Sequence, residues 1–394
     1  MRNSLLVLYA TLFFNSVFSQ IASGKGKWLG NVINSTTPAN FITYWNQVTP
    51  ENAGKWGSVE NSQDVMQWGT LDMVYDQSRT KGIPFKFHTL IWGQQEPAFI
   101  KNLSSSLQLK EVESWIMQAC SRYPEAEYID VVNEPLHAPP SYAAALGGQG
   151  ITGWDWIVWA FETARKYCPK AKLILNDYNI LSNDDNTSKF IEIIEVLKSK
   201  KLIDGIGEQG HFFETTPLQT IQDNLGRLIS TGLPIYISEF DVNIANDQDQ
   251  LEKYKQLFPI WWEHPAVKGV TLWGYQQNQI WRTNAYLLRS DGSERPAMTW
   301  LKGYIGLSTS IRPLQLPDQY LKIVTNPVTN HRLRLEYDEH IKKLEILSVM
   351  GSLLQTYRNV STNASTMDID LPHGLYFVKA YSAQGFVLKK FILD

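Results

Sequence analysis

The sequence predicts an α/β protein: a (β/α)8 TIM barrel followed by a small C-terminal antiparallel β-sandwich. Three observations carry this prediction. Eight short apolar runs alternate with amphipathic segments over roughly 280 residues, which is the length of a TIM barrel. Nearly all of these runs end in polar or aromatic residues. From about residue 320 onward, short alternating runs separated by turns replace the first pattern.

The predicted barrel strands are near-continuous apolar runs, as expected for strands buried on both faces. They lie at residues 28–33, 47–52, 84–92, 128–135, 172–179, 203–212, 234–242 and 269–276. Amphipathic segments at 71–82, 155–168 and 189–201 separate some of them and predict helices. A doubly wound open sheet is the alternative. It would require a glycine-rich phosphate turn after the first strand, and "GNVINSTTP" offers none.

The predicted organisation is a signal peptide at 1–19, a barrel at 20–306, a linker at 307–320 and a sandwich at 321–394. Arg2, the apolar run 5–14 and Ser19 fit an export signal, and the run is too short to span a bilayer. A buried N-terminal helix is the alternative. "STSIRPLQLPDQ" has linker composition, and the sandwich strands are expected at 331–337, 342–349, 352–360, 367–372, 375–382 and 386–394.

Composition limits the partners. A net charge of −3 gives no electrostatic case for nucleic acid or an anionic membrane. The chain has 14 Trp and 18 Tyr, and a surplus of such residues often forms surfaces that stack on sugar rings. Cys120 and Cys168 show neither a disulfide framework nor metal-ligand spacing, so we expect two buried thiols.

The polar strand ends predict one functional site. In a TIM barrel the C-terminal ends of all strands meet on the same face, so their side chains would converge in a single crater. Helix caps and turns are the alternative, but they account for Asp and Asn rather than Glu, His and Trp. The strand-end residues are Glu51, Asn52, His88, Trp92, Asn133, Glu134, Asn176, Asp177, Gln209, His211, Glu239, Asp241 and Trp273.

Glu134 and Glu239 are the candidate catalytic pair. Two carboxyl groups facing each other at about 5 Å can cleave a glycosidic bond with retention, one as proton donor and the other as nucleophile. Asp241 shares a strand face with Glu239, and His211 comes from the neighbouring strand. An Asp–His–Glu chain would keep Glu239 ionised, whereas apolar neighbours would keep Glu134 protonated. Two solvated carboxylates are the alternative.

These strand ends resemble glycoside hydrolase family 10, the retaining endo-β-1,4-xylanases, over about residues 27 to 305. The resemblance implies a secreted endo-1,4-β-xylanase that hydrolyses internal xylosidic bonds of xylan by double displacement, without cofactor or metal. Hydrolysis of β-glucan and non-catalytic polysaccharide binding are the rival functions. The matching segments, in strand order, are "VTPENAGKW", "FHTLIW", "DVVNEP", "LILNDYN", "IDGIGEQGH", "ISEFDV", "LWGYQQNQIWR" and "LLRSDGSERPA".

The resemblance also implies roles for individual residues. Glu134 would be the general acid/base and Glu239 the nucleophile, with His211 and Asp241 tuning Glu239. Asn133 would bind the sugar 2-hydroxyl. The remaining substrate contacts would be Glu51, Asn52 and Lys55 on the non-reducing side, His88, Trp92, Gln95 and Gln209 at the cleavage subsite, and Trp273 and Trp281 as an apolar wall with Arg282 beside them.

The chain departs from the family pattern at three positions. Gly54, Gly93 and Phe99 stand where methionine, histidine and tryptophan are usual. None of these is a catalytic carboxylate. The departures predict a reshaped or more open subsite.

The tail resembles the C-terminal sorting domain of the bacterial type IX secretion route, on "VTNPVTNHRLRLEY", "LEILSVMGSLLQTY", "IDLPHGLYFVKAY" and "VLKKFILD". This implies export machinery as a partner beside xylan or xylo-oligosaccharide, and a secreted or cell-surface location without a membrane span. A carbohydrate-binding module is the alternative. It would use exposed aromatic residues, for which Tyr337, Tyr357, Tyr376 and Tyr381 are candidates.

Overall fold

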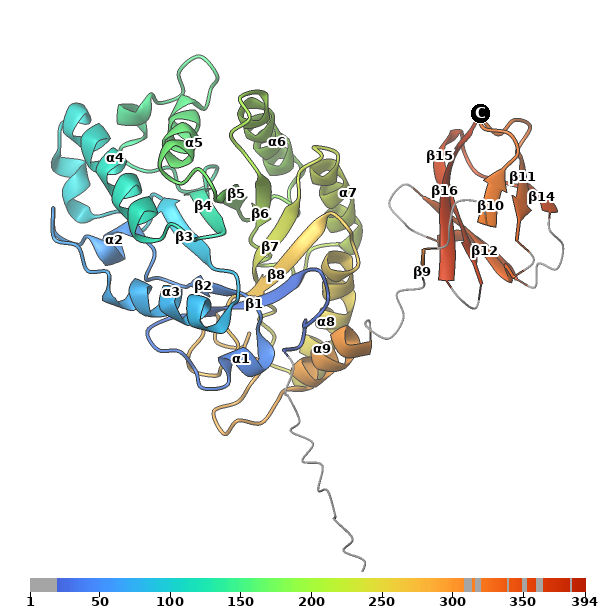
Figure 1. Cartoon of the computed structure of the whole chain (residues 1–394), viewed down its shortest axis with the longest axis horizontal. Helices are drawn as coiled ribbons and strands as arrows, with labels where there is room; N and C mark the ends of the chain where they lie inside the picture. The colour runs from blue at the N-terminus through green and yellow to red at the C-terminus, as the bar shows by residue number, and fades with distance from the viewer. Residues whose placement is uncertain are drawn as a thin grey trace, which may run out of the picture.

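The computed structural model describes residues 20–307, 314–315, 320–338, 340–348, 353–358, 364–382 and 385–394. The predicted signal peptide at 1–19 and most of the predicted linker lie outside these ranges. Eight parallel strands form one sheet in the order β2-β1-β8-β7-β6-β5-β4-β3. Val48 N donates a hydrogen bond to Pro84 O at 3.0 Å, and a parallel bridge joins Val48 to Phe85, so the two ends of the sheet meet. The predicted TIM barrel is confirmed (Figure 1).

Each predicted barrel run overlaps one strand. The strands are β1 (Trp28–Ile33), β2 (Val48–Pro50), β3 (Lys86–Ile91), β4 (Tyr128–Asn133), β5 (Lys172–Asp177), β6 (Gly205–Glu208), β7 (Ile235–Phe240) and β8 (Val267–Leu272). The helices are α1 (Phe41–Tyr44), α2 (Trp56–Val59), α3 (Gly69–Lys81), α4 (Ser105–Arg122), α5 (Asp155–Tyr167), α6 (Asp184–Ser199), α7 (Leu218–Ile229), α8 (Asp247–Trp262) and α9 (Pro296–Leu307). The longer helices surround the strands (Figure 1).

Side chains fill the interior of the barrel below the functional face. Trp28 stacks on Tyr236 with ring centroids 5.0 Å apart, and Ile174 packs in the same cluster. Higher in the barrel, Lys86 Nζ lies 2.7 Å from Asp130 Oδ2, and both side chains are buried. The interior is therefore a packed core rather than a channel, and a ligand can reach the barrel only at its ends.

The expectation of two free thiols is wrong. Cys120, near the C-terminal end of α4, forms a disulfide with Cys168, which follows α5 directly. The Cα atoms are 5.2 Å apart across a sequence separation of 48 residues. The two cysteines meet because α4 and α5 pack against each other as neighbouring parallel helices of the barrel wall and end on the same side. A pairing that depends on tertiary packing has no local spacing signal.

This disulfide is expected to stabilise the barrel. The double variant Cys120→Ala/Cys168→Ala should lower the free energy of unfolding by about 2–4 kcal/mol, because the cross-link restricts a long loop of the unfolded chain. Urea denaturation of the variant and of the parent, each with and without reductant, measures this difference. Reductant should destabilise the parent and leave the variant unchanged. An equal transition midpoint in all four samples would contradict the expectation.

The C-terminal region contains two further sheets, with strand orders β10-β11-β14 and β13-β12-β15-β16-β9. Buried apolar residues from both sheets, including Leu333, Leu335, Ile346, Val378 and Phe391, form one core. This confirms the predicted β-sandwich. The strands are β9 (Leu314–Gln315), β10 (Leu321–Ile323), β11 (Arg332–Tyr337), β12 (Lys343–Ser348), β13 (Leu353–Arg358), β14 (Ala364–Asp368), β15 (Gly374–Tyr381) and β16 (Gly385–Leu393).

The sandwich differs from its prediction at three strands. β9 lies within the predicted linker and pairs parallel with β16, and β10 was also missed. β14 begins three residues before the predicted run at 367–372; Ile369 leaves the strand, and its N–H bonds to His331 O. Tyr337 and Tyr376 are buried, whereas Tyr357 and Tyr381 are half-buried, so these four do not form an exposed aromatic row. Within the described ranges, no helix is both long and apolar enough to cross a membrane.

Candidate active site

A cavity of about 560 Å³ opens at the C-terminal ends of the barrel strands. It brings together most of the predicted site residues: Glu51, Asn52, Lys55, His88, Trp92, Gln95, Glu134, Gln209, His211, Glu239, Trp273 and Trp281. The predicted residues Asn133, Asp241 and Arg282 do not line the cavity and instead contact residues that do. The structure also places Gln94, Tyr178 and Phe212 in the lining, which the site prediction did not include.

Glu134 follows the last residue of β4 and is buried. Its Oε2 accepts a hydrogen bond from Trp92 Nε1 at 3.0 Å, and its Oε1 accepts one from Gln209 Nε2 at 3.0 Å. Burial raises the pKa of Glu134. The hydrogen bond from Gln209 opposes this rise, and the charge of Glu239 adds to it. The carboxyl group is thereby suited to keep its proton and to donate it.

Glu239 lies on β7 and faces the same cavity. His211 Nε2 lies 3.2 Å from Glu239 Oε2, and Asn176 Nδ2 donates to Glu239 Oε1 at 2.8 Å. Burial alone would raise the pKa of Glu239. The hydrogen bond from His211 and nearby positive charge outweigh burial and bring that pKa to about 2. Glu239 is therefore ionised near neutral pH, as a nucleophile must be.

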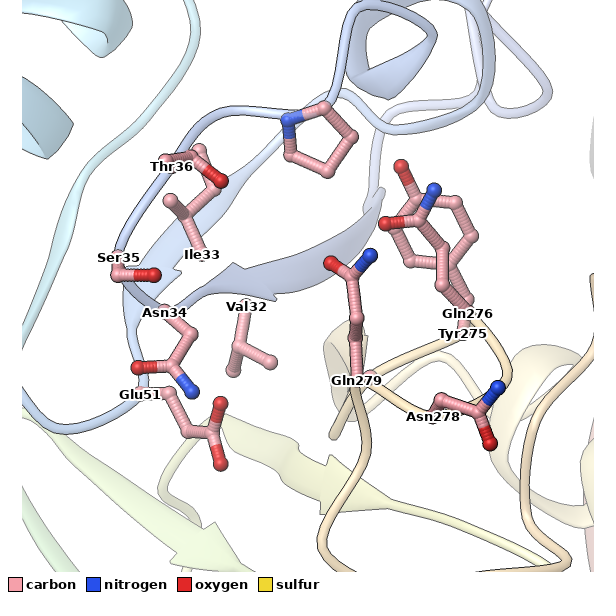
Figure 2. A pocket seen from close by; sticks show the side chains of 12 residues that line it. Val32, Ile33, Asn34, Ser35, Thr36, Glu51, Tyr275, Gln276, Asn278 and Gln279 are labelled. Carbon is pink, nitrogen blue, oxygen red and sulfur yellow. The ribbon is translucent and has the colours of Figure 1, made fainter. Parts of the chain in front are cut away.

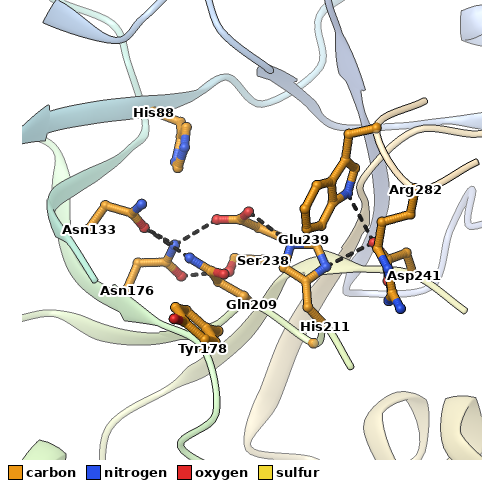
Figure 3. Close-up of polar contacts among 12 residues, drawn as sticks. His88, Asn133, Asn176, Tyr178, Gln209, His211, Ser238, Glu239, Asp241 and Arg282 are labelled. Carbon is orange, nitrogen blue, oxygen red and sulfur yellow. Dashed lines mark hydrogen bonds and ion pairs between the residues drawn. The ribbon is translucent and has the colours of Figure 1, made fainter. Parts of the chain in front are cut away.

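His211 connects Glu239 to Asp241 (Figure 3). Its Nδ1 lies 2.9 Å from Asp241 Oδ2, a close ion pair whose direction is not that of an ideal hydrogen bond. Burial lowers the pKa of His211, but the charge of Asp241 more than compensates and raises it to about 10. Asp241 is held in turn by Trp281 Nε1 at 3.1 Å and by the guanidinium of Arg282. Asp241, His211 and Glu239 therefore lie in contact in the order of the predicted Asp–His–Glu chain.

Asn176, one of the predicted strand-end residues to which no role was assigned, links Glu239 to Asn133. Its Nδ2 donates to Asn133 Oδ1 at 2.7 Å as well as to Glu239, and its Oδ1 accepts from Ser238 Oγ at 2.6 Å (Figure 3). A Cβ atom at Gly207 would lie 2.2 Å from Asn176 Oδ1, so glycine on the adjacent strand makes room for this amide. The sequence signal for Asn176 was its position at a strand end, within "LILNDYN".

The missed lining residues come mainly from loops. Tyr178 stacks on His137 with ring centroids 4.0 Å apart. Phe212 is 49% exposed, has a φ of 64° and carries the guanidinium of Arg282 over its ring at 4.7 Å. Tyr178 lies near the end of the predicted run 172–179 beside Asp177, and Phe212 ends the predicted run 203–212 beside His211. Position beside such residues was their only sequence signal.

Two further predicted residues, Lys55 and His88, each contact a neighbouring polar side chain. Lys55 Nζ donates to Asn52 Oδ1 at 2.8 Å and lies 4.7 Å from the centroid of the Trp92 ring. Burial lowers the pKa of Lys55, which the charges of Glu239 and Glu51 oppose. His88 Nδ1 lies 2.9 Å from Asp130 Oδ2, and burial lowers the pKa of His88. The cavity wall thus combines the cationic groups of Lys55 and His211, the carboxyl groups of Glu51, Glu134 and Glu239, and flat aromatic surfaces.

Backbone occupies the space at two of the departures from the family pattern. A Cβ atom at Gly54 would lie 2.4 Å from His88 O, and one at Gly93 would lie 2.4 Å from Pro139 O. Phe99 packs edge-to-face against Trp56, with ring centroids 6.2 Å apart. The rim is therefore reshaped by close backbone contacts and is not opened at Gly54 or Gly93.

Within the described chain, one group of carboxylates could approach a metal ion together: Glu60, Asp64 and Glu111. Glu60 already accepts hydrogen bonds from Trp56 Nε1 and Asp64 N, each at 2.7 Å. None of the three lines the cavity.

Comparison with known proteins identifies the family. The family model described as "Glycosyl hydrolase family 10" matches residues 14–304. The chain belongs to glycosyl hydrolase family 10. A second model, "Secretion system C-terminal sorting domain", matches residues 322–394 and marks this family 10 enzyme for export to the cell surface or the medium by the type IX route. The match confirms the sorting prediction for the sandwich.

Several named proteins are similar in sequence or structure to this family 10 enzyme. Endo-1,4-beta-xylanase B of Cellvibrio japonicus is 42% identical over 282 residues, which are 70% of this chain and 45% of that protein. Beta-1,4-xylanase of Dictyoglomus thermophilum is 30% identical over 258 residues, covering 60% of this chain and 73% of that protein. This chain therefore spans less than half of the Cellvibrio relative. Native xylanase 10B from Thermotoga maritima has the same fold, with a TM-score of 0.67 and 23% sequence identity. The match covers 74% of this chain and 98% of the Thermotoga chain.

Proposed function

We propose that this family 10 enzyme is a secreted retaining endo-1,4-β-xylanase that cleaves internal bonds of xylan. One observation carries the proposal: Glu134 and Glu239 line one cavity, and their surroundings shift their pKa values in opposite directions. A protonated acid and an ionised carboxylate at one site are what double displacement at a sugar carbon requires.

In the first step, Glu239 attacks the anomeric carbon and forms a covalent glycosyl ester. The glycosidic C–O bond breaks as Glu134 transfers its proton to the departing oxygen, so the chain on the reducing side leaves as an alcohol. In the second step, Glu134, now a carboxylate, takes a proton from water, and the resulting hydroxide displaces Glu239 from the anomeric carbon. The proton on Glu134 and the charge on Glu239 are then restored.

The neighbouring side chains position these two groups. His211, held by Asp241 and Arg282, keeps Glu239 charged until it attacks. We assign the sugar 2-hydroxyl to Asn133 Nδ2, which donates to Glu134 Oε1 at 3.3 Å, because Asn133 Oδ1 already accepts from Asn176 and Gln209. We further assign the non-reducing side to Glu51, Asn52 and Lys55, the cleavage subsite to His88, Trp92, Gln95 and Gln209, and the wall beneath the sugar to Trp273 and Trp281.

Two observations favour xylan over β-glucan. Both named curated relatives above are called xylanases. Trp273 and Trp281 present indole surface to the cavity, and a pentose lacks the hydroxymethyl arm that would crowd such a wall. Crowding of this kind typically discriminates by roughly 1–3 kcal/mol. Turnover on xylan should therefore exceed turnover on carboxymethyl-cellulose.

We assign catalysis to residues 20–306 and sorting to residues 321–394, joined by a linker at 307–320 and preceded by a signal peptide at 1–19. The disulfide supports export, because such bonds persist mainly in oxidising compartments.

Product stereochemistry tests the mechanism. Proton NMR of freshly released xylo-oligosaccharides should show the β-anomer first, with the α-anomer growing in later by mutarotation. This result is expected because two displacements at one carbon restore its configuration. Initial release of the α-anomer would exclude Glu239 as a nucleophile.

A further inference from the structure

Glu208, the last residue of β6, is a buried carboxyl group to which the proposed mechanism gives no part. It lies outside the groove at the C-terminal ends of the strands. That groove contains the catalytic cavity and a neighbouring cavity of about 310 Å³, which shares Glu51 with it (Figure 2). Glu208 lines neither cavity, so any effect on the reaction must pass through the residues that it holds.

One oxygen of Glu208 holds a tight turn of the backbone. Glu208 Oε1 accepts a hydrogen bond from Gly210 N at 3.1 Å. Gly210 has a φ of 87°, and a Cβ atom there would lie 3.0 Å from Ile237 Cγ2 and 3.1 Å from Phe240 Cα, so the turn packs closely against β7. A buried backbone N–H needs an acceptor, and within residues 20–307 Gly210 N has this one.

His211 depends on this turn more than Gln209 does. Gln209 N donates to the carbonyl oxygen at the end of β5 at 3.0 Å, and Glu239 N donates to Gln209 O at 2.7 Å, so both neighbouring strands hold Gln209. The backbone N–H and C=O of His211 make no hydrogen bond within residues 20–307. The bond from Gly210 N is therefore the last backbone hydrogen bond before His211, whose Nε2 lies 3.2 Å from Glu239 Oε2.

Glu208 acts as a neutral acceptor. Burial raises its pKa well above the ordinary value, and the hydrogen bond from Gly210 opposes this rise. The charges of Asp177 and Glu239 raise the pKa further, whereas the charge of His211 lowers it. Because the carboxyl group keeps its proton, it places no second negative charge beside Glu239. A glutamine side chain, which offers the same carbonyl oxygen without charge, should therefore serve equally well.

The other oxygen of Glu208 indicates that packing alone does not explain this residue. Glu208 Oε2 is buried and makes no hydrogen bond within the described residues. A buried polar oxygen without a partner costs stability, and leucine would fill a similar volume without that cost. The carboxyl group is explained by the acceptor that it offers to the turn.

We propose that Glu208 is a positioning residue whose Oε1 holds the Gly210 turn and thereby keeps His211 in contact with Glu239. This role rests on the proposed function, because it takes Glu239 as the nucleophile. Loss of the acceptor should loosen the turn, move His211 and leave Gln209 in place.

Four variants test this role. Glu208→Leu removes the acceptor, and Glu208→Asp withdraws it by one methylene group and replaces the leucine variant as the test if that variant does not fold. Glu208→Gln keeps the acceptor. Glu60→Leu is the matched control, because Glu60 is also buried and its Oε1 accepts a backbone N–H, that of Asp64, at 2.7 Å, but it does not line the catalytic cavity.

In Glu208→Leu and Glu208→Asp, kcat on xylan should fall about 10- to 100-fold, as expected for a group displaced by about 1 Å, with KM changed by less than about 3-fold. Burial raises the pKa of Glu239, and the hydrogen bond from His211 is the strongest effect that opposes this rise. When that contact weakens, the pKa of Glu239 rises, so kcat should gain an acid limb above about pH 3. The alkaline limb, which Glu134 sets, should stay in place.

Glu208→Gln should keep the parent kcat and pH profile. Glu60→Leu should lower the melting temperature and leave the pH profile unchanged. Parent kcat without an acid limb in Glu208→Leu or Glu208→Asp would overturn the proposal. A Glu208→Gln variant as impaired as Glu208→Leu would also overturn it, as would an equal acid limb in Glu60→Leu.

A second measurement does not depend on activity. Titration of the Glu239 carboxyl carbon by ¹³C NMR, assigned by comparison with Glu239→Gln, gives the pKa of Glu239 in the parent and in each variant. This pKa should be higher in Glu208→Leu and Glu208→Asp than in the parent and Glu208→Gln, and an equal pKa in all four would overturn the proposal. Inactivity of the parent on xylan, with the pKa values in the expected order, would instead refute the proposed function.

Discussion

Replacing Glu239 by alanine is expected to reduce kcat on xylan by at least about 10⁴-fold, since the variant has no group to form the glycosyl ester. The pKa of Glu239 is lowered to about 2, so the carboxylate is ionised across the whole range in which xylan hydrolysis would be assayed. The activity of the parent enzyme should therefore show no acid limb from this group above about pH 3. Initial rates of reducing-sugar release measure the loss.

The loss must be separated from misfolding. His211 lies between Glu239 and Asp241, so in the alanine variant the buried imidazolium still has Asp241 as a carboxylate partner. Thermal unfolding of the Glu239→Ala variant should therefore shift only modestly. Glu252→Ala, which removes a half-exposed glutamate paired with Lys255 on α8, serves as the matched control and should keep the parent rate. A Glu239→Ala variant that retains near-normal turnover on xylan would refute the nucleophile assignment.

The barrel was predictable because its signal is local and repeated. Each strand is an apolar run that can be recognised by itself, and alternation with helices then determines the parallel order. The sandwich was less predictable at its edges. β9 contains only Leu314 and Gln315, and such a short pairing depends on β16, about seventy residues later along the chain, so no window of sequence reveals it.

The site was predictable to the extent that strand ends determine it. Glu134 and Glu239 both follow from that rule, and both line the cavity. The rule does not tell a residue that faces the ligand from one that stands behind it. Asp241 contacts His211 and Arg282 rather than the cavity, and neither Asp241 nor Arg282 lines it.

Loops and long-range pairings account for the rest. Phe212 lies in the loop after β6 with a positive φ and lines the cavity; the sequence placed it at the end of a predicted strand but did not indicate that its ring faces the cavity. Cys120 and Cys168 meet only when α4 and α5 pack. Asn176 on β5 combines hydrogen bonds to Asn133 on β4 and Glu239 on β7, and this role becomes visible only once the strands are placed in the barrel.

Replacing Glu134 by alanine should produce a loss that depends on the leaving group. On xylan, kcat/KM should fall about 10³-fold, within the range of about 10²–10⁴ for general acid catalysis, because the departing sugar oxygen needs a proton. On an aryl xylobioside with a strongly acidic phenol, the first step needs little protonation, and kcat/KM should fall less than about 10-fold. A nucleophile variant would lose both activities equally, so this contrast separates the two roles.

The pH dependence gives an independent check on Glu134. Its pKa is raised by burial, and the group must be protonated to act, so activity is present below that pKa and is lost as the pH rises through it. The parent's kcat/KM on xylan should show this alkaline limb, whereas Glu134→Ala assayed on the activated aryl substrate should not. Glu195→Ala, a half-exposed change on α6, should preserve the limb. If the limb persists in Glu134→Ala at the same pH, another group supplies the proton.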